Sequence, residues 1–312
     1  MTAAEMKERA PRNRTLELTA QDRKRLSDAI VRPSGQALIS EPRDAVILGA
    51  AAETLPLLPK KSFDLLFADP PYNLTKSFGT NKFKAVSQAD YETFTDEWLS
   101  AAVPLLKPTA SVYICGDWRS SAAIQNVGSK YLVLRNRITW EREKGRGSKA
   151  NWKNSSEDIW FFTVSDEYTF NPDAVKLKRK VIAPYTENGK PKDWEEESEG
   201  RFRLTHPSNL WTDLTVPFWS MPENTDHPTQ KPEKLLAKLI LASTNEGDLL
   251  LDPFLGSGTS AVSARKLGRG FTAIEIEEEY CLLAAKRLEL AREDGRIQGL
   301  ENGVFWERNA RS

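Results

Sequence analysis

The sequence predicts an α/β protein built on a parallel sheet that helices cover on both faces. From about residue 44 to residue 293, short apolar runs typical of strands alternate with segments of helical periodicity. Several of the apolar runs end in a polar or glycine-containing turn. Ligands in such sheets bind at the carboxyl ends of the strands, where the strand order reverses. We therefore look for the functional residues in these turns.

The first half of the pattern contains most of the predicted strands. The strands are 45–48, 63–68, 111–115, 137–140 and 158–163, and a helix is predicted from 91 to 106, closed by Lys107 and Pro108. Residues 1–44 are charged and weakly amphipathic, and we expect an extension that lies against the main body.

The second half repeats the alternation after an interruption. Residues 170–226 are rich in Lys, Glu, Pro and Asn and show little periodicity. The elements predicted after them are helix 232–243, strand 248–252, helix 259–267, strand 270–275 and helix 278–293. The apolar face of the first of these helices consists of Leu235, Leu236, Leu239 and Ile240. The chain is thus divided into 1–44, 45–169, 170–226 and 227–312.

The composition argues against a disordered, a disulfide-rich or a membrane-spanning protein. Of 312 residues 39% are hydrophobic and 28% charged, which is typical of a globular chain. Lys+Arg and Asp+Glu both number 44, so a nucleic-acid surface would need locally concentrated charge. Cys115 and Cys281 are predicted to be packing residues, and no metal site is expected. No run reaches the roughly 18 apolar residues of a membrane span, and the N-terminus lacks a signal-peptide core. We expect a soluble, cytoplasmic protein.

A glycine-containing turn follows the apolar strand at 249–251, in the sequence LLLDPFLGSGTS. Gly256 and Gly258 allow a tight turn in which a ligand approaches the backbone and the N–H groups of the next helix. Glu275 ends the following strand, where its carboxylate can accept both hydroxyl hydrogens of a ribose. Together they indicate a cofactor that contains adenosine, and they leave open NAD or S-adenosylmethionine.

Two further motifs narrow this choice. They are Asp69-Pro70-Pro71-Tyr72, which ends the strand at 63–68, and the segment HPTQKP at 227–232. With the loop at 252–258, they resemble the amino-methyltransferases of restriction–modification and cell-cycle DNA methylation. The order of the motifs is similar to the β class, whose sheet is circularly permuted. The resemblance implies a Rossmann-like, seven-stranded sheet with one antiparallel strand, S-adenosylmethionine as methyl donor, and a target-recognition region inserted at 170–226.

The resemblance also implies the residues that bind the cofactor. Those of the loop are Asp252, Phe254, Gly256, Ser257 and Gly258, the ribose acid is Glu275, and the segment that closes over the methionine end is Thr229, Gln230 and Lys231. One turn departs from the family. Where the family usually has Gly-Asp after the first strand, Gly49 is followed by three alanines and Glu53. Either Glu53 replaces that acid or the contact is absent.

The chemistry of amine methylation explains the catalytic turn. An exocyclic amine of a base is a poor nucleophile, and acceptors for both of its hydrogens stabilise the charge that develops during attack. We assign these acceptors to the Asp69 carboxylate and the Pro70 carbonyl. The base must leave the duplex, and Tyr72 is expected to stack on it. Aspartate as the first residue favours adenine N6 in this family. The alternatives are cytosine N4, an NAD-binding oxidoreductase that uses Gly256 and Gly258, and a DNA-binding module without activity.

Two basic loops, 75–85 and 142–153, are candidates for DNA contact. The residues predicted to bind DNA are Lys76, Lys82, Lys84, Arg142, Lys144, Arg146, Lys149, Trp152 and Lys153. In the region 170–226, the candidate phosphate contacts are Lys176, Lys178, Arg179 and Lys180. The candidate base readers are Arg201, Arg203 and Asn209. The acidic run 193–199 indicates that part of this region faces away from DNA. The expected partner is double-stranded DNA. A restriction–modification system would add a cognate endonuclease, and the family often forms homodimers.

Overall fold

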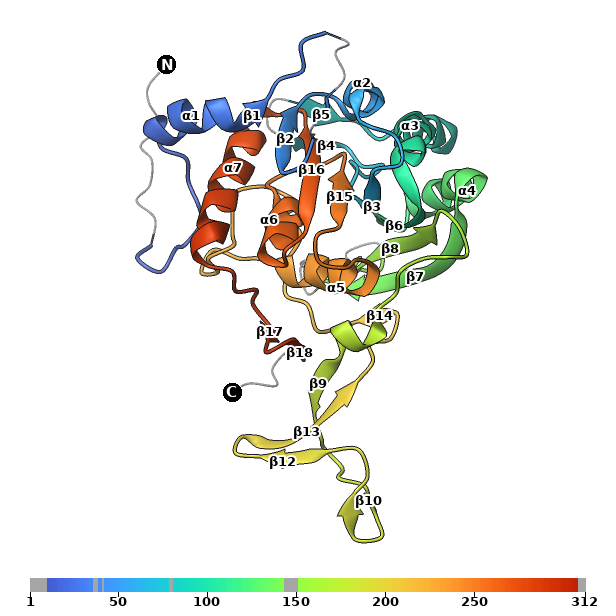
Figure 1. Ribbon diagram of the computed structural model, residues 1–312, viewed down its shortest axis with the longest axis vertical. Helices are drawn as coiled ribbons and strands as arrows, with labels where there is room; N and C mark the ends of the chain where they lie inside the picture. Colours follow the sequence, from blue (N-terminus) through green and yellow to red (C-terminus); the bar gives the residue numbers. More distant parts are fainter. Residues whose placement is uncertain (1–9, 36–38, 41, 79–80, 143–150, 308–312) are drawn as a thin grey trace.

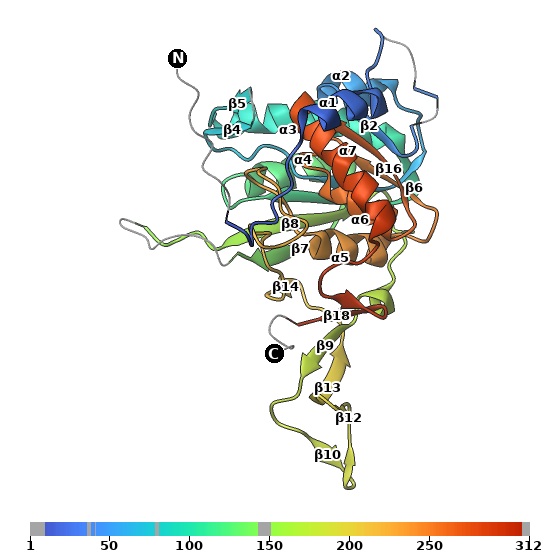
Figure 2. The same cartoon turned by 90° about the vertical axis from the view of Figure 1, so that its left-hand side faces the viewer.

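The protein is described by a computed structural model that covers residues 10–35, 39–40, 42–78, 81–142 and 151–307. Its body is a large sheet with helices on both faces, and a narrow arm of short strands projects from one end of the body (Figures 1 and 2). The predicted α/β class is confirmed.

The main sheet contains nine strands within these ranges. Their order across the sheet is β1-β2-β16-β15-β3-β6-β8-β7-β14. Their bounds are β1 Ile30–Val31, β2 Ala45–Leu48, β3 Phe63–Ala68, β6 Leu106–Gly116, β7 Val133–Glu141, β8 Ser156–Thr163, β14 Leu210–Trp211, β15 Leu249–Asp252 and β16 Gly270–Glu275. Strand β8 runs antiparallel to both of its neighbours, and all other pairs are parallel. The two-residue strands β1 and β14 extend the implied seven-stranded arrangement at its edges.

Helices pack on both faces of this sheet. Their bounds are α1 Ala20–Leu26, α2 Ala51–Thr54, α3 Gln88–Ala102, α4 Ser121–Tyr131, α5 Glu233–Ser243, α6 Thr259–Lys266 and α7 Glu278–Glu293. Helices α1, α5, α6 and α7 contribute to the core on one face, and α3 and α4 to the core on the other. Strand β3 supplies both cores, with Leu65 and Phe67 on the first face and Leu66 and Ala68 on the second. This double burial explains why its sequence is a continuous apolar run.

The helix predicted at 91–106 has clearly different boundaries in the structure. Helix α3 begins at Gln88 because the Ser87 side chain accepts a hydrogen bond from the backbone of Asp90. It ends at Ala102 rather than 106, since Pro104 cannot donate a helical hydrogen bond. Residues Val103–Leu105 form a 3₁₀ turn, and β6 begins at Leu106. The apolar face predicted for α5 is confirmed, because its four residues are all buried.

The centre of the sheet joins the two halves of the sequence. Strand β15 pairs in parallel with β3, with Leu250 beside Leu65 and Leu251 beside Leu66. On its other side β15 pairs with β16, which ends at Glu275. The carboxyl ends of three neighbouring strands therefore bring together the catalytic turn, the glycine loop and the predicted ribose acid.

The projecting arm is formed by most of the interrupting region. Its sheet has the order β12-β13-β9-β18-β17. The bounds of these strands are β9 Leu177–Lys180, β12 Glu195–Glu197, β13 Gly200–Thr205, β17 Leu300–Glu301 and β18 Val304–Trp306. A further hairpin, β10 Thr186–Glu187 and β11 Lys190–Pro191, turns at Asn188 and Gly189, which both have left-handed φ angles (53° and 74°). Asn-Gly is the usual signal for such a turn, although no hairpin was predicted at this position.

The state of the cysteines and the search for membrane-spanning helices concern all of the described residues. Cys115 and Cys281 are both buried and free. No helix in the described ranges is long and apolar enough to cross a membrane.

Candidate active site

A cavity of about 440 Å³ lies at the carboxyl ends of β3 and β15. Its wall includes Asp69 to Tyr72 of the catalytic turn, Asp252 to Ser257 of the glycine loop, and Glu275. His227, Thr229, Gln230 and Lys231 line it from the opposite segment. Segments that lie far apart in the sequence, at 69–72, 227–231, 252–257 and 275, therefore line one cavity.

Asp69 is at the centre of a polar cluster inside this cavity. Its Oδ1 accepts a hydrogen bond from the Tyr72 hydroxyl (2.9 Å), and its Oδ2 accepts one from Lys231 Nζ (2.6 Å). Glu157, at the start of β8, completes the cluster. Its Oε2 lies 3.0 Å from the Tyr72 hydroxyl and 3.4 Å from Lys231 Nζ, and its Oε1 pairs with Arg142. Only 4% of the Glu157 side chain is exposed.

Burial and charge act in opposite directions on these groups. Burial raises the pKa of Asp69, although the charge of Lys231 opposes this. For Glu157 burial also opposes ionisation, but Lys231 and Arg142 together hold its pKa below the ordinary value. Burial lowers the pKa of Lys231, yet the two carboxylates outweigh it and raise that pKa overall. The cluster thus holds two acidic and two basic side chains with balanced charge.

The catalytic turn is held in place from outside the cavity. The Tyr91 hydroxyl donates to the Pro71 carbonyl (3.0 Å), and the Asn73 amide N–H donates to Ser120 Oγ (3.0 Å). The Asn73 side chain also pairs with the backbone of Val86, at 2.8 and 3.0 Å. The turn therefore has little freedom to move, which favours a fixed geometry for Asp69.

The glycine loop has the tight geometry that its sequence predicts. Gly256 and Gly258 have left-handed φ angles of 55° and 93°. A Cβ atom on Gly258 would lie 2.6 Å from the Cβ of Ala284 in α7, and one on Gly256 would lie 3.0 Å from Nε2 of His227. Only glycine allows this close approach at both positions.

The two acidic residues of this half both accept hydrogen bonds from the glycine loop. Asp252 is buried and binds its own loop, accepting from the Phe254 N–H (2.9 Å) and from the Ser260 hydroxyl. Burial raises the pKa of Asp252 to about 7. Glu275 accepts from the N–H groups of Gly256 (2.8 Å) and Glu277 (2.9 Å), and it lines the cavity. Both carboxylates therefore fix the glycine loop, and both border the cavity in which a ligand could bind.

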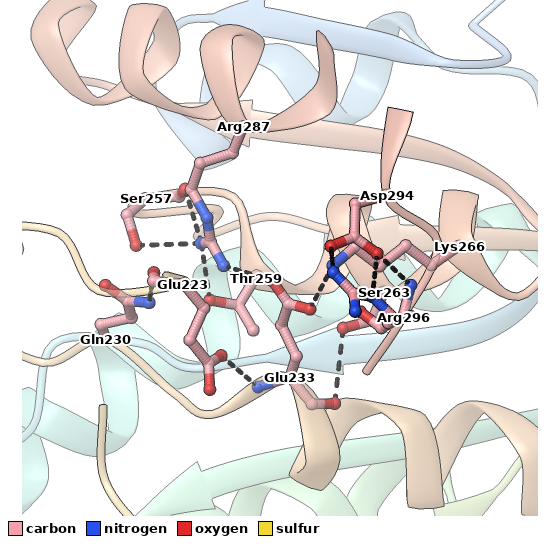
Figure 3. Close-up of polar contacts among 10 residues, drawn as sticks. All are labelled: Glu223, Gln230, Glu233, Ser257, Thr259, Ser263, Lys266, Arg287, Asp294 and Arg296. Carbon is pink, nitrogen blue, oxygen red and sulfur yellow. Dashed lines mark hydrogen bonds and ion pairs between the residues drawn. The ribbon is translucent and has the colours of Figure 1, made fainter. Parts of the chain in front are cut away.

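Beneath the loop lies a buried arginine that was not among the predicted site residues (Figure 3). Arg287 of α7 donates to the Ser257 carbonyl (2.9 Å) and to Thr259 Oγ1 (3.0 Å). Its other terminal nitrogen lies 3.0 Å from Glu233, whose second oxygen lies 2.8 Å from Lys266. This network joins α5, α6 and α7 under the start of α6. The only sequence signal is the position of Arg287 three residues after Ala284, on the packed side of the helix.

The segment 227–232 forms part of the cavity wall through Thr229, Gln230 and Lys231, and two of these side chains also bind other parts of the chain. The Gln230 side chain binds a neighbouring segment of the chain. Its Oε1 accepts a hydrogen bond from the Thr225 hydroxyl (2.6 Å), and its Nε2 donates one to the Glu223 carbonyl (2.6 Å). Lys231 binds Asp69 and Glu157, so it belongs to the polar cluster as well as to the cavity wall. Burial lowers the pKa of His227 to about 3, so this imidazole is neutral at physiological pH.

The turn after β2 has no acidic replacement. Gly49 and the three alanines that follow it line the cavity, whereas the side chain of Glu53 is exposed. Of the two explanations for the departure from the family, the structure favours the absence of this contact.

The predicted DNA-binding residues occupy several environments. Lys76 lines the cavity, Lys84 and Lys153 are exposed, and Trp152 is 93% exposed. Arg142 instead turns inward to Glu157. The side chain of Lys82 and all of Lys144, Arg146 and Lys149 lie outside the described residues.

In the arm, basic residues have acidic partners close by. Lys178 pairs with Glu197 (2.6 Å), and Arg201 with Glu196 (3.4 Å). Arg203 lies 3.6 Å from Asp193. The acidic run thus sits among the basic side chains and is not segregated on a separate face. Asn209, a candidate base reader, donates to the carbonyl of Arg137 (3.1 Å).

Comparison with known proteins places these features in context. A sequence model described as "DNA methylase" matches residues 63–286. The type II methyltransferase M.HpaI of Haemophilus parainfluenzae is 33% identical over 247 residues, covering 78% of this chain and 74% of that protein. The DNA adenine methyltransferase YhdJ of Escherichia coli K12 is 34% identical over 258 residues, covering 79% and 83%.

Solved structures share the fold. The PvuII cytosine-N4-specific DNA methyltransferase aligns with a TM-score of 0.59 at 17% identity, covering 83% of this chain and 93% of that chain. The complex of M1.HpyAVI with S-adenosylmethionine aligns with a TM-score of 0.53 at 24% identity, covering 78% and 98%. At these identities the likeness extends to the fold alone.

Proposed function

The chain belongs to the DNA methylase family, and we propose that it is a site-specific methyltransferase that transfers a methyl group from S-adenosylmethionine to N6 of a flipped adenine in duplex DNA. The observation that carries the proposal is the shared cavity, in which Asp69 to Tyr72 and the glycine loop meet at the ends of β3 and β15. Two similar proteins support it, since M.HpaI is named a type II methyltransferase and YhdJ a DNA adenine methyltransferase.

The residues present fit the cofactor. Gly256 lines the cavity and, with Gly258, lets the loop turn tightly, and the Glu275 carboxylate faces the cavity where ribose hydroxyls can donate to it. When bound, S-adenosylmethionine supplies a methyl group on a positively charged sulfur, so transfer to the amine is one displacement. Thr229 and Phe254 contribute further wall on either side.

Asp69 is the group that we assign to the amine. A carboxylate has about four acceptor positions, and Tyr72 and Lys231 use two of them. The remaining positions can accept a hydrogen of the adenine amine, with the Pro70 carbonyl accepting the other. This arrangement stabilises the charge that develops on the nitrogen. The ring of Tyr72 is assigned to stacking on the base.

Adenine is preferred over cytosine because aspartate begins the catalytic turn and because YhdJ is named as an adenine methyltransferase. The oxidoreductase alternative rested on the glycine loop alone, and family membership removes it. A role in a restriction–modification system is supported by the type II name of M.HpaI. A cognate endonuclease, a homodimer and a cytoplasmic location are further parts of the proposal.

The experiment that tests the proposal is transfer of tritium from labelled S-adenosylmethionine to DNA. Asp69→Ala should abolish transfer while it leaves binding of duplex DNA largely intact. The matched control is Asp28→Ala, which removes an exposed carboxylate that does not line the cavity and should transfer at the wild-type rate. Retained transfer in Asp69→Ala would remove the role that we assign to this carboxylate.

A further inference from the structure

Glu157 is a buried acid in the cavity that no motif identifies. It lies at the start of β8, opposite Trp140 of β7, and its side chain reaches the catalytic turn from the antiparallel strand. An acid this deeply buried is rare unless it is paired. Its partners here are Tyr72, Lys231 and Arg142.

The Tyr72 hydroxyl has two carboxylate oxygens beside it but only one hydrogen to donate. A phenol has one hydrogen to donate, yet its oxygen lies 2.9 Å from Asp69 Oδ1 and 3.0 Å from Glu157 Oε2. With both carboxylates ionised, only one of these contacts can be a full hydrogen bond. The second becomes one when a proton enters the cluster, because a protonated Asp69 then donates to the phenol oxygen and the phenol donates to Glu157.

We propose that Glu157 is a positioning carboxylate for methyl transfer, and that it receives through the Tyr72 hydroxyl the proton that the methylated amine releases. This inference rests on the proposed function. As the C–N bond forms and the C–S bond breaks, the nitrogen becomes positive and loses one hydrogen as a proton to Asp69. That proton passes to the Tyr72 oxygen, while the hydrogen of Tyr72 passes to Glu157.

The surroundings of Glu157 suit this task. Arg142 and Lys231 keep Glu157 ionised before the reaction, so its oxygen is open to a proton, and the same two cations make it a weak base that holds the proton only in passing. Arg142 stays protonated and cannot relay the proton, but its side chain is 30% exposed, so water can reach this end of the cluster and take the proton from Glu157 after transfer. The ionisable groups around it are Asp69, Tyr72, Lys231 and Arg142, with Lys76 and Cys115 at longer range. A pH profile therefore reports on this whole cluster.

The test compares Glu157→Gln, Tyr72→Phe and the double variant in single-turnover methylation of a duplex, measured from pH 6 to 9. The matched control is Glu141→Gln, a neighbouring exposed acid on β7. Calorimetry with S-adenosylmethionine and a DNA-binding titration accompany each variant. Wild-type transfer on this duplex is measured first, and its absence would count against the proposed function and not against Glu157.

We expect Glu157→Gln to slow transfer on the order of 100-fold at pH 7, the size usual for a positioned acid or base, with cofactor and DNA affinity within about threefold. Its rate should rise with pH, because solvent must then take the proton, and the wild-type rate should be flat. Adding Glu157→Gln to Tyr72→Phe should cost little more, since both act along one path.

Two results would overturn the inference: a Glu157→Gln rate within twofold of wild type, or effects that multiply in the double variant. If Glu157→Gln does not fold, Tyr72→Phe decides alone, because it removes only one oxygen atom. A slow rate that rises with pH then supports the relay. A rate and profile equal to wild type contradict it.

Discussion

Replacement of Gly258 by alanine is the sharpest structural test of the cofactor half. This residue precedes α6 with a φ angle of 93°, and a Cβ atom there would lie 2.6 Å from the Cβ and 2.9 Å from the Cα of Ala284. The second contact is with backbone, so no side-chain rotation relieves it. Either the loop must change its path or α6 and α7 must separate, and both changes would displace the loop residues Gly256 and Ser257, which line the cavity.

The magnitude follows from two contributions to the free energy of unfolding. A left-handed residue with a side chain costs about 1–2 kcal/mol, and a forced contact in a packed core costs about 1–3 kcal/mol. We therefore expect Gly258→Ala to destabilise the protein by about 2–5 kcal/mol. Gly247→Ala is the matched control, because its φ is 84° but nothing lies within 4 Å of the new atom. It should lose only the first contribution, about 1–2 kcal/mol.

Urea unfolding of both variants at one pH measures the difference, and calorimetry measures the affinity for S-adenosylmethionine. Gly258→Ala should bind the cofactor at least tenfold more weakly, whereas Gly247→Ala should bind it as the wild type does. Equal losses of stability in the two variants would refute the argument that close approach to α7 requires glycine at position 258.

Two further predictions concern buried ionisable groups. Burial beside Glu233 raises the pKa of Glu223 to about 7, so the folded protein binds more protons than the unfolded chain between about pH 4.5 and 7 and stability falls as pH rises there. Glu223→Gln should make this slope shallower by up to about 1.4 kcal/mol per pH unit, and chemical unfolding at several pH values measures it; an unchanged slope would contradict the assignment. Lys231→Gln removes the cation from Asp69 and Glu157, which raises the pKa of Asp69, so transfer should slow at least tenfold and recover partly at higher pH. Calorimetry should show that the affinity of Lys231→Gln for S-adenosylmethionine changes by less than about threefold. The role of Lys231 beside Asp69 would be refuted if the variant bound the cofactor poorly but transferred methyl groups at the wild-type rate at saturating cofactor.

The sequence predicted those parts of the site that are encoded locally. The strand–turn pairs at Asp69 and Asp252 carry their own signals, namely an apolar run and a turn of proline or glycine. Parallel pairing of β3 with β15 then brings them together, as the resemblance implied. Gly256 and Gly258 were predicted for the conformations that they adopt.

What the sequence did not reveal depends on contacts between distant elements. Glu157 reaches Tyr72 only because β8 runs antiparallel between β6 and β7. Its one local signal is an acid at the start of an apolar strand. Arg287 appears as one of many charges in a closing helix, and its burial follows from the packing of α7 on α6. Lys231 was assigned to the cofactor from its motif, and its contact with Asp69 required the fold.

The most direct test of the central claim is mass spectrometry of nucleosides from duplex DNA incubated with the protein and S-adenosylmethionine. The account predicts N6-methyldeoxyadenosine in the digest, absent when the protein carries Asp69→Ala. N4-methyldeoxycytidine in its place, or no methylated nucleoside with DNA that spans a host genome, would contradict it.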